Sequence, residues 1–221
     1  PSNLAPVATA PTAPTVLEDA TNVALADNIQ VNDTDGDSQT VTFTVTGGTV
    51  SLGTTGITFG GSGNGTASFT AAGTLAAINT ALDAATFAPT ANLNGTNAGT
   101  IAFKSNDGII DSSTASVSFN ITAVNDEPSF TKGANQTVLE DAGAQTVNGW
   151  ATNLNKGNAN ESAQTLSFAV TNNNNGLFSA QPAISAAGNL TYTPVANANG
   201  STTVSLVLTD DGGIANSGEN T

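Results

Sequence analysis

The sequence predicts an all-β protein made of two tandem β-sandwiches, and three features lead to that fold class. Apolar residues alternate with polar ones along several segments, as at Val41, Phe43 and Val45, and a period of two is typical of strands with one buried face. Asn-Gly pairs, which favour tight turns, punctuate the chain; they begin at Asn64, Asn94, Asn148, Asn175 and Asn199. The third feature is a long internal repeat.

The internal repeat sets the number of domains. Residues 15–20, Thr-Val-Leu-Glu-Asp-Ala, recur letter for letter as residues 137–142, an offset of 122. Residues 86–89, Thr-Phe-Ala-Pro, return as Thr-Tyr-Thr-Pro at residues 191–194, an offset of 105. Because the offset decreases along the chain, the second copy is expected to be the shorter one.

The two copies and the segments that flank them define the expected domains. Residues 1–14 contain four of the eight prolines, which indicates an extended linker or arm. A first sandwich should span 15–123 and a second 129–221, with a linker over 124–128. The chain starts at Pro1 and stops in a polar stretch, so we expect it to be a piece of a longer protein.

A short helix is expected in the first copy, near residues 74–84. Thr74 is a suitable N-cap, because its hydroxyl can accept a hydrogen bond from the first helical turn. Leu75, Ile78 and Leu82 follow at helical spacing and fall on one face.

The second copy lacks a last strand in this chain. The first copy ends with an alternating segment at residues 115–122, in which Val117, Phe119 and Ile121 share one face. After Asp211-Gly212 only nine residues remain in the second copy, and none of them has that pattern.

The composition excludes several function classes. The chain has no His and no Cys, so it offers no Ser-His or Cys-His nucleophile pair and no ordinary zinc site. Its formal charge is −14, with only three Lys or Arg in total, which excludes an electrostatic footprint for nucleic acid. No apolar run approaches the roughly 18 residues that a membrane span needs. We therefore expect a non-enzymatic protein whose favoured partner is a cation.

The acidic residues lie mostly at expected turns and strand ends. Asp33, Asp35 and Asp37 alternate within one short segment, and further acids follow at turns of both copies. Turns collect at the two ends of a sandwich, so several carboxylates could converge there and provide the hard oxygen ligands that Ca²⁺ prefers. The alternative is that acids occupy turns simply because Asp and Asn suit turn backbones.

Several short motifs follow one another in a fixed order. They are Leu-Glu-Asp, Asn-Asp-x-Asp-x-Asp, Thr-Phe/Tyr-x-Pro-x-Ala-Asn-x-Asn-Gly, Asn-Asp-Gly and Val-Asn-Asp-x-Pro. In this order the chain resembles the tandem cadherin-like and bacterial Ig-like (VCBS-type) repeats of large RTX-type bacterial surface adhesins. The resemblance implies Ig/cadherin-like Greek-key sandwiches that are joined end to end and stiffened by calcium at the domain ends.

The resemblance also implies a set of calcium ligands. They would be Glu18, Asp33, Asp35, Asp37 and Asp107 in the first domain, Asn125 and Asp126 in the linker, and Glu140, Glu161 and Asp211 in the second domain. Two departures from the pattern matter. Leu4 stands where the pattern has Asp, and residues 158–161 replace the Asp-x-Asp-x-Asp run with fewer charges. We therefore expect a weaker or absent site in the second domain.

The expected function is an extracellular structural module of an adhesin or surface-layer protein at the bacterial cell surface, with Ca²⁺ and neighbouring repeats as partners. One alternative is a self-assembling filament or sheath subunit, completed by strand donation from a neighbouring chain, which the missing last strand motivates. Another alternative is a glycan-binding module, with Trp150 or Tyr192 as a sugar platform, although packing is the favoured role of both aromatics.

Overall fold

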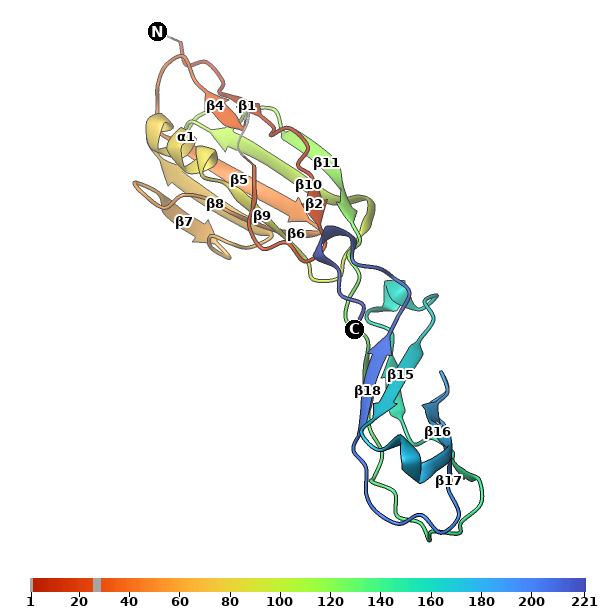
Figure 1. The fold of residues 1–221 in the computed structure, drawn as a ribbon. Helices are drawn as coiled ribbons and strands as arrows, with labels where there is room; N and C mark the ends of the chain where they lie inside the picture. The colour runs from red at the N-terminus through yellow and green to blue at the C-terminus, as the bar shows by residue number, and fades with distance from the viewer. Residues whose placement is uncertain (1, 26–28) are drawn as a thin grey trace. The chain divides into compact units, whose positions relative to one another are not determined.

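The computed structural model describes residues 2–25 and 29–221, which form a mostly β-structure with one short α-helix. Pro1, the first residue of the expected arm, lies outside the described residues. The chain divides into two compact units, Pro1–Ala123 and Val124–Thr221 (Figure 1). Among the described residues, no helix is both long and apolar enough to cross a membrane.

The first unit is organised around a six-stranded sheet. In spatial order its strands are β2 (Val16–Leu17), β11 (Ala115–Thr122), β10 (Gly95–Asn106), β5 (Gln39–Thr46), β8 (Ser68–Gly73) and β7 (Thr58–Gly61). Neighbouring strands are antiparallel except β2 and β11, which run parallel. This parallel pair brings the start of the unit beside its last strand.

Two smaller sheets and the helix complete the first unit. They are a three-stranded sheet of β3 (Val23–Ala24), β9 (Thr86–Pro89) and β6 (Gly48–Ser51), a two-stranded sheet of β1 (Val7–Thr9) and β4 (Gln30–Asn32), and α1 (Leu75–Asp83). The Pro-rich arm is extended, and its strand β1 pairs with β4 inside this unit, where Pro6 and Pro11 are buried.

The alternation along β5 places its apolar residues in the core. Val41, Phe43 and Val45 are buried, whereas the threonines between them face outward or lie at the margin of the core. Phe43 stacks between Phe69 and Phe103, with ring centroids 5.1 Å apart in both pairs. Burial of such aromatic side chains supplies much of the hydrophobic stabilisation of a small β-unit.

The expected helix is confirmed by α1. The Thr74 hydroxyl accepts a hydrogen bond from the Ala77 amide at 3.2 Å, which caps the first turn. Ile78 and Leu82 are buried, as their helical spacing predicts. The Asn79 side chain pairs with the backbone of Val31, so the helix is also fixed to β4.

The second unit has three small antiparallel sheets. They consist of β13 (Gln145–Val147), β17 (Leu190–Pro194) and β16 (Phe178–Ile184); of β15 (Ser167–Asn172) and β18 (Val204–Thr209); and of β12 (Ser129–Thr131) and β14 (Thr152–Asn155). Three 3₁₀ turns, η1 (Ala159–Glu161), η2 (Asn175–Leu177) and η3 (Ala215–Ser217), connect or follow them. Ile184, Leu190 and Tyr192 form the centre of its core. Residues 210–221, all described, contain no further strand.

Candidate functional site

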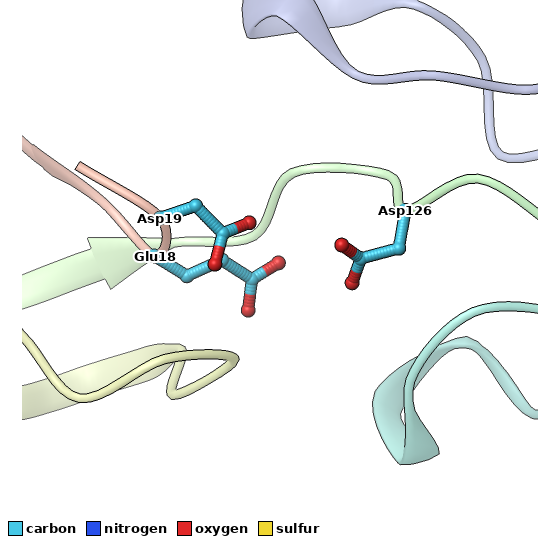
Figure 2. Close-up of side chains that lie close together, drawn as sticks. All are labelled: Glu18, Asp19 and Asp126. Carbon is cyan, nitrogen blue, oxygen red and sulfur yellow. The ribbon is translucent and has the colours of Figure 1, made fainter.

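Three carboxylates gather where β2 ends. One oxygen from each of Glu18, Asp19 and Asp126 lies within 4.8 Å of the others. Figure 2 shows these three side chains close together. Within the described part of the chain, this is the one group of three or more His, Cys, Asp or Glu side chains with that spacing.

The pairing of β2 with β11 positions Glu18 and Asp19. Val16 lies opposite Ile121 in the parallel pair, and the Glu18 amide extends the ladder by donating to the Thr122 carbonyl at 3.0 Å. The chain that leaves β11 reaches Asp126 four residues later. Strand pairing therefore positions Glu18, and the connecting segment that follows β11 carries Asp126.

The three carboxylates differ in exposure. Glu18 is fully buried and accepts a hydrogen bond from the Asn94 side chain at 2.6 Å. Asp126 is half-buried and Asp19 is exposed. Two like unit charges about 5 Å apart repel by about 3 kcal/mol at an effective dielectric of about 20. A cation bound by such carboxylates would turn this repulsion into attraction, and these hard oxygens suit Ca²⁺.

A second acidic group lies where the first unit begins. The Asn3 side chain donates to Asp107 Oδ2 at 2.7 Å. The other oxygen of Asp107 accepts from the amides of Ile109 and Ile110, each at 2.8 Å. The Ile110 amide, followed by the Asn3 side chain, lowers the pKa of Asp107 below its ordinary value.

The Asp33–Asp37 segment belongs to this second group. The Leu4 amide donates to Asp35 Oδ2 at 2.7 Å, and the Gln39 side chain donates to Asp33 Oδ2 at 2.5 Å. Gln39 also donates to the backbone carbonyl of Asp37, whose side chain is exposed. Asp35 therefore holds the incoming chain through a backbone amide, as Asp107 does through the side-chain amide of Asn3.

The second unit has a related arrangement around Asn125. Its side-chain amide donates to Asp210 Oδ1 at 3.0 Å, and its side-chain oxygen accepts from Gln164 at 2.6 Å. The Asp126 amide donates to Glu161 at 2.8 Å, and the other Glu161 oxygen accepts from the Asn158 amide at 2.8 Å. The Asn158 side chain bonds the Asp126 carboxylate.

Similar contacts therefore occur in both units, near positions that the sequence repeat relates. In each, an Asn side chain donates to an Asp near the end of a long strand, and the next residue's amide donates to an acid that precedes a second strand. The equivalent contacts are Asn3–Asp107 with Asn125–Asp210, and Leu4–Asp35 with Asp126–Glu161.

Two further expected ligands, Asp211 and Glu140, lie elsewhere. The Asp211 carboxylate accepts from the Thr165 amide at 2.8 Å and from the Thr165 hydroxyl at 2.7 Å, and these bonds, the hydroxyl first, lower its pKa. Glu140 is exposed, although its counterpart Glu18 is buried. Glu18 adjoins a paired strand, whereas residues 137–139 form no strand.

Sequence reasoning missed two residues of these groups. Asp19 is not among the expected ligands, although it adjoins Glu18 at the end of β2. Asp210, rather than Asp211, bonds Asn125 and is 5% exposed. The period of β18 carries the missing signal: Leu206, Leu208 and Asp210 fall on the same face, so Asp210 continues the inward series.

No protein-family model matches the chain, and no curated protein matches it in sequence.

Proposed function

We propose that the chain is a non-enzymatic, calcium-binding structural module of an extracellular protein of the bacterial cell surface. In this proposal each unit is an Ig/cadherin-like Greek-key sandwich, and Ca²⁺ bound at the domain ends stiffens a tandem array. The acidic group of Glu18, Asp19 and Asp126 carries the proposal, because its three carboxylates could hold a metal ion.

The oxygen chemistry favours Ca²⁺ over Mg²⁺. Calcium accepts six to eight oxygens in flexible geometry, whereas Mg²⁺ demands near-ideal octahedral geometry and retains its water. The three carboxylates come from two separate segments and differ in burial, from the fully buried Glu18 to the exposed Asp19. A larger and less demanding ion fits such an irregular ligand set.

The fold and the location rest on other observations. The sheet order of the first unit, with its last strand β11 between β2 and β10, supports the sandwich assignment. The absence of His and Cys from the sequence supports a structural rather than catalytic role. The extracellular location follows from the resemblance to repeats of bacterial surface adhesins.

Thermal unfolding in metal-free and calcium-containing buffer tests the proposal. The chain is melted in excess EDTA, in millimolar Ca²⁺ and in millimolar Mg²⁺, and far-UV circular dichroism follows the transition. Native-state binding at a hundredfold excess over Kd stabilises by about 2.7 kcal/mol, so we expect a rise of several degrees with Ca²⁺ alone.

A matched pair of variants makes the test specific to the carboxylate group. Asp126→Asn removes one proposed ligand, and Glu127→Gln removes an adjacent exposed charge. The calcium-induced rise should shrink in the first variant and persist in the second. If the melting temperature is the same in EDTA and in Ca²⁺, the carboxylates do not bind calcium in the folded state. The proposal would then fail.

The glycan-binding alternative has less support. Tyr192 is 7% exposed, and the indole N–H of Trp150 donates to the Ala134 carbonyl at 2.8 Å. The buried Tyr192 ring therefore offers no open platform of the kind that stacks on a sugar, and the indole N–H of Trp150 already has a partner within the fold.

A further inference from the structure

The five Asn-Gly pairs of the chain can undergo a reaction that is unrelated to metal binding. In such a pair the glycine nitrogen can attack the side-chain carbonyl carbon of the asparagine, which releases ammonia and leaves a cyclic imide. Glycine hinders this attack least, because it has no Cβ. The asparagine side chain must turn toward the next residue, and the backbone must follow. Hydrogen bonds to either group therefore oppose the reaction.

Hydrogen bonds hold both reacting groups of the Asn64-Gly65 pair. The Asn64 side chain accepts from the Leu52 amide at 2.8 Å and donates to the Leu52 carbonyl at 2.9 Å. The Gly65 nitrogen, which would be the nucleophile, donates to the Val50 carbonyl at 3.1 Å. This pair is therefore protected on the side chain and on the backbone.

Two further pairs lie on the surface of the second unit and are held on the backbone side. The Gly149 nitrogen donates to the Asn189 side chain at 2.8 Å. Asn175 begins the 3₁₀ turn η2, and its carbonyl accepts from the Phe178 amide. That bond restrains the peptide unit that contains the Gly176 nitrogen. The nucleophile of each pair is therefore fixed, although the asparagine is exposed.

The remaining pairs, Asn94-Gly95 and Asn199-Gly200, are repeat counterparts with a similar backbone. Gly95 has a φ of +130° and Gly200 a φ of +145°, values that favour glycine. The Asn94 side chain donates to the buried Glu18 carboxylate at 2.6 Å, and Gly95 is the first residue of β10. These contacts restrain the pair in the first unit.

Asn199-Gly200 has no such restraint. Both residues are exposed, and they lie outside the helices and strands of the second unit. Within the part of the chain that the structure describes, no hydrogen bond involves the backbone or the side chain of either residue. The asparagine side chain and the glycine nitrogen can therefore approach each other without breaking a contact of the fold.

We propose that Asn199 is a site of spontaneous deamidation, and that its pair is the first of the five to react in the folded chain. The Gly200 nitrogen forms a bond to Asn199 Cγ while the Cγ–Nδ2 bond breaks. The Gly200 N–H proton and the Nδ2 amino group leave together as ammonia. Water, the only co-reactant, then opens the imide at one of its two carbonyls and gives aspartate or isoaspartate.

The reaction changes the connection between β17 and β18. Either product adds one negative charge to a chain whose net charge is −14. Isoaspartate also lengthens the backbone by one methylene group. Because the pair is exposed and makes no hydrogen bond in the described structure, the second unit should tolerate both changes. This inference is independent of calcium binding.

Incubation of the full 221-residue chain in mildly alkaline buffer tests the proposal. Isoelectric focusing follows the acidic form, and peptide mapping by tandem mass spectrometry measures conversion at each Asn-Gly pair. Electron-transfer dissociation distinguishes isoaspartate from aspartate. We expect Asn199 to react at least tenfold faster than Asn64 and Asn94. In concentrated urea the protecting contacts are lost, so the rates should agree within about threefold, because glycine follows each asparagine.

Two matched variants at exposed positions assign the acidic form. Asn199→Ala should remove most of it, whereas Asn148→Ala, at a pair whose glycine is hydrogen-bonded, should leave its rate of formation unchanged. Three outcomes would overturn the proposal. They are another pair that reacts as fast as Asn199 in the folded chain, a reaction of Asn199 at least tenfold slower in the folded chain than in urea, and an equal effect of the two variants.

Discussion

The side-chain amide of Asn125 donates a hydrogen bond to the Asp210 carboxylate at 3.0 Å, as Asn3 does to Asp107 in the first unit. Asn125 also accepts from Gln164 at 2.6 Å. Asp210 is 5% exposed, and its other oxygen has no hydrogen-bond partner in the described structure. Asn125 is therefore the link between the first residues of the second unit and a buried carboxylate.

Asn125→Ala should destabilise the second unit by about 1–3 kcal/mol, because it leaves a buried carboxylate and an amide with fewer partners. Urea unfolding followed by the fluorescence of Trp150, the single Trp of the chain, reports on this unit. With a slope of about 1–3 kcal/mol per molar urea, the midpoint should fall by about 1 M. Asn3→Ala is the matched control in the first unit, and an equal shift of the Trp150 transition by both variants would contradict the local role of Asn125.

The second prediction concerns acid unfolding and the bonds from Thr165 to Asp211. These bonds lower the pKa of Asp211 below its ordinary value of 3.8. A carboxyl group with a depressed folded-state pKa stabilises the fold above the unfolded-state pKa, and this stability is lost as the pH falls through the folded-state pKa. The contribution of Asp211 is therefore complete at neutral pH and decreases below about pH 4.

Asp211→Asn should make the stability of the second unit less steeply dependent on pH in that acid range. The urea midpoint of the Trp150 transition, measured between pH 6 and pH 2, checks this. Glu127→Gln, at an exposed carboxyl of the same unit, should leave the slope unchanged. If stability depends on pH equally steeply in Asp211→Asn and in the unsubstituted chain, the Thr165 bonds do not favour the ionised Asp211 carboxylate over its neutral form.

The third prediction tests the cap of α1. Thr74→Ala removes the hydroxyl that accepts from the Ala77 amide, which should destabilise the first unit by about 1 kcal/mol. Thr74→Ser keeps the acceptor and should keep most of the stability. Chemical unfolding followed by far-UV circular dichroism measures both variants, and equal losses in the two would assign the effect to the methyl group rather than the cap.

Local sequence patterns predicted the parts of the fold that depend on neighbouring residues. The alternation at Val41, Phe43 and Val45 predicted the buried face of β5, and Thr74 predicted the start of α1. Both are local, because a strand face and a helix cap are fixed by residues a few positions apart.

The environments of Glu18 and Glu140 could not be predicted in this way. Both glutamates lie in the same six-residue sequence, yet Glu18 is buried and Glu140 is exposed. The difference depends on pairing with a strand about 100 residues away in sequence, which no local pattern encodes. The expectation of Asp211 rather than Asp210 has another cause. The letters Asp-Gly pair Asp107-Gly108 with Asp211-Gly212, whereas the two-residue period of the strand determines which carboxylate points inward.

The last prediction is that the effect of Glu18→Gln on the melting temperature differs between EDTA and Ca²⁺. Glu18→Gln removes one of three neighbouring negative charges and keeps an oxygen that can accept from the Asn94 amide. In EDTA the substitution should therefore leave the melting temperature unchanged or raise it, since repulsion decreases. In millimolar Ca²⁺ it should lower the melting temperature, because a proposed ligand is lost.

Asp83→Asn, at an exposed site at the end of α1, controls for the general effect of reducing a net charge of −14. A loss of stability that is equal in EDTA and Ca²⁺ would show that Glu18 acts only as a hydrogen-bond acceptor within the fold, and the assignment of Glu18 as a calcium ligand would be wrong.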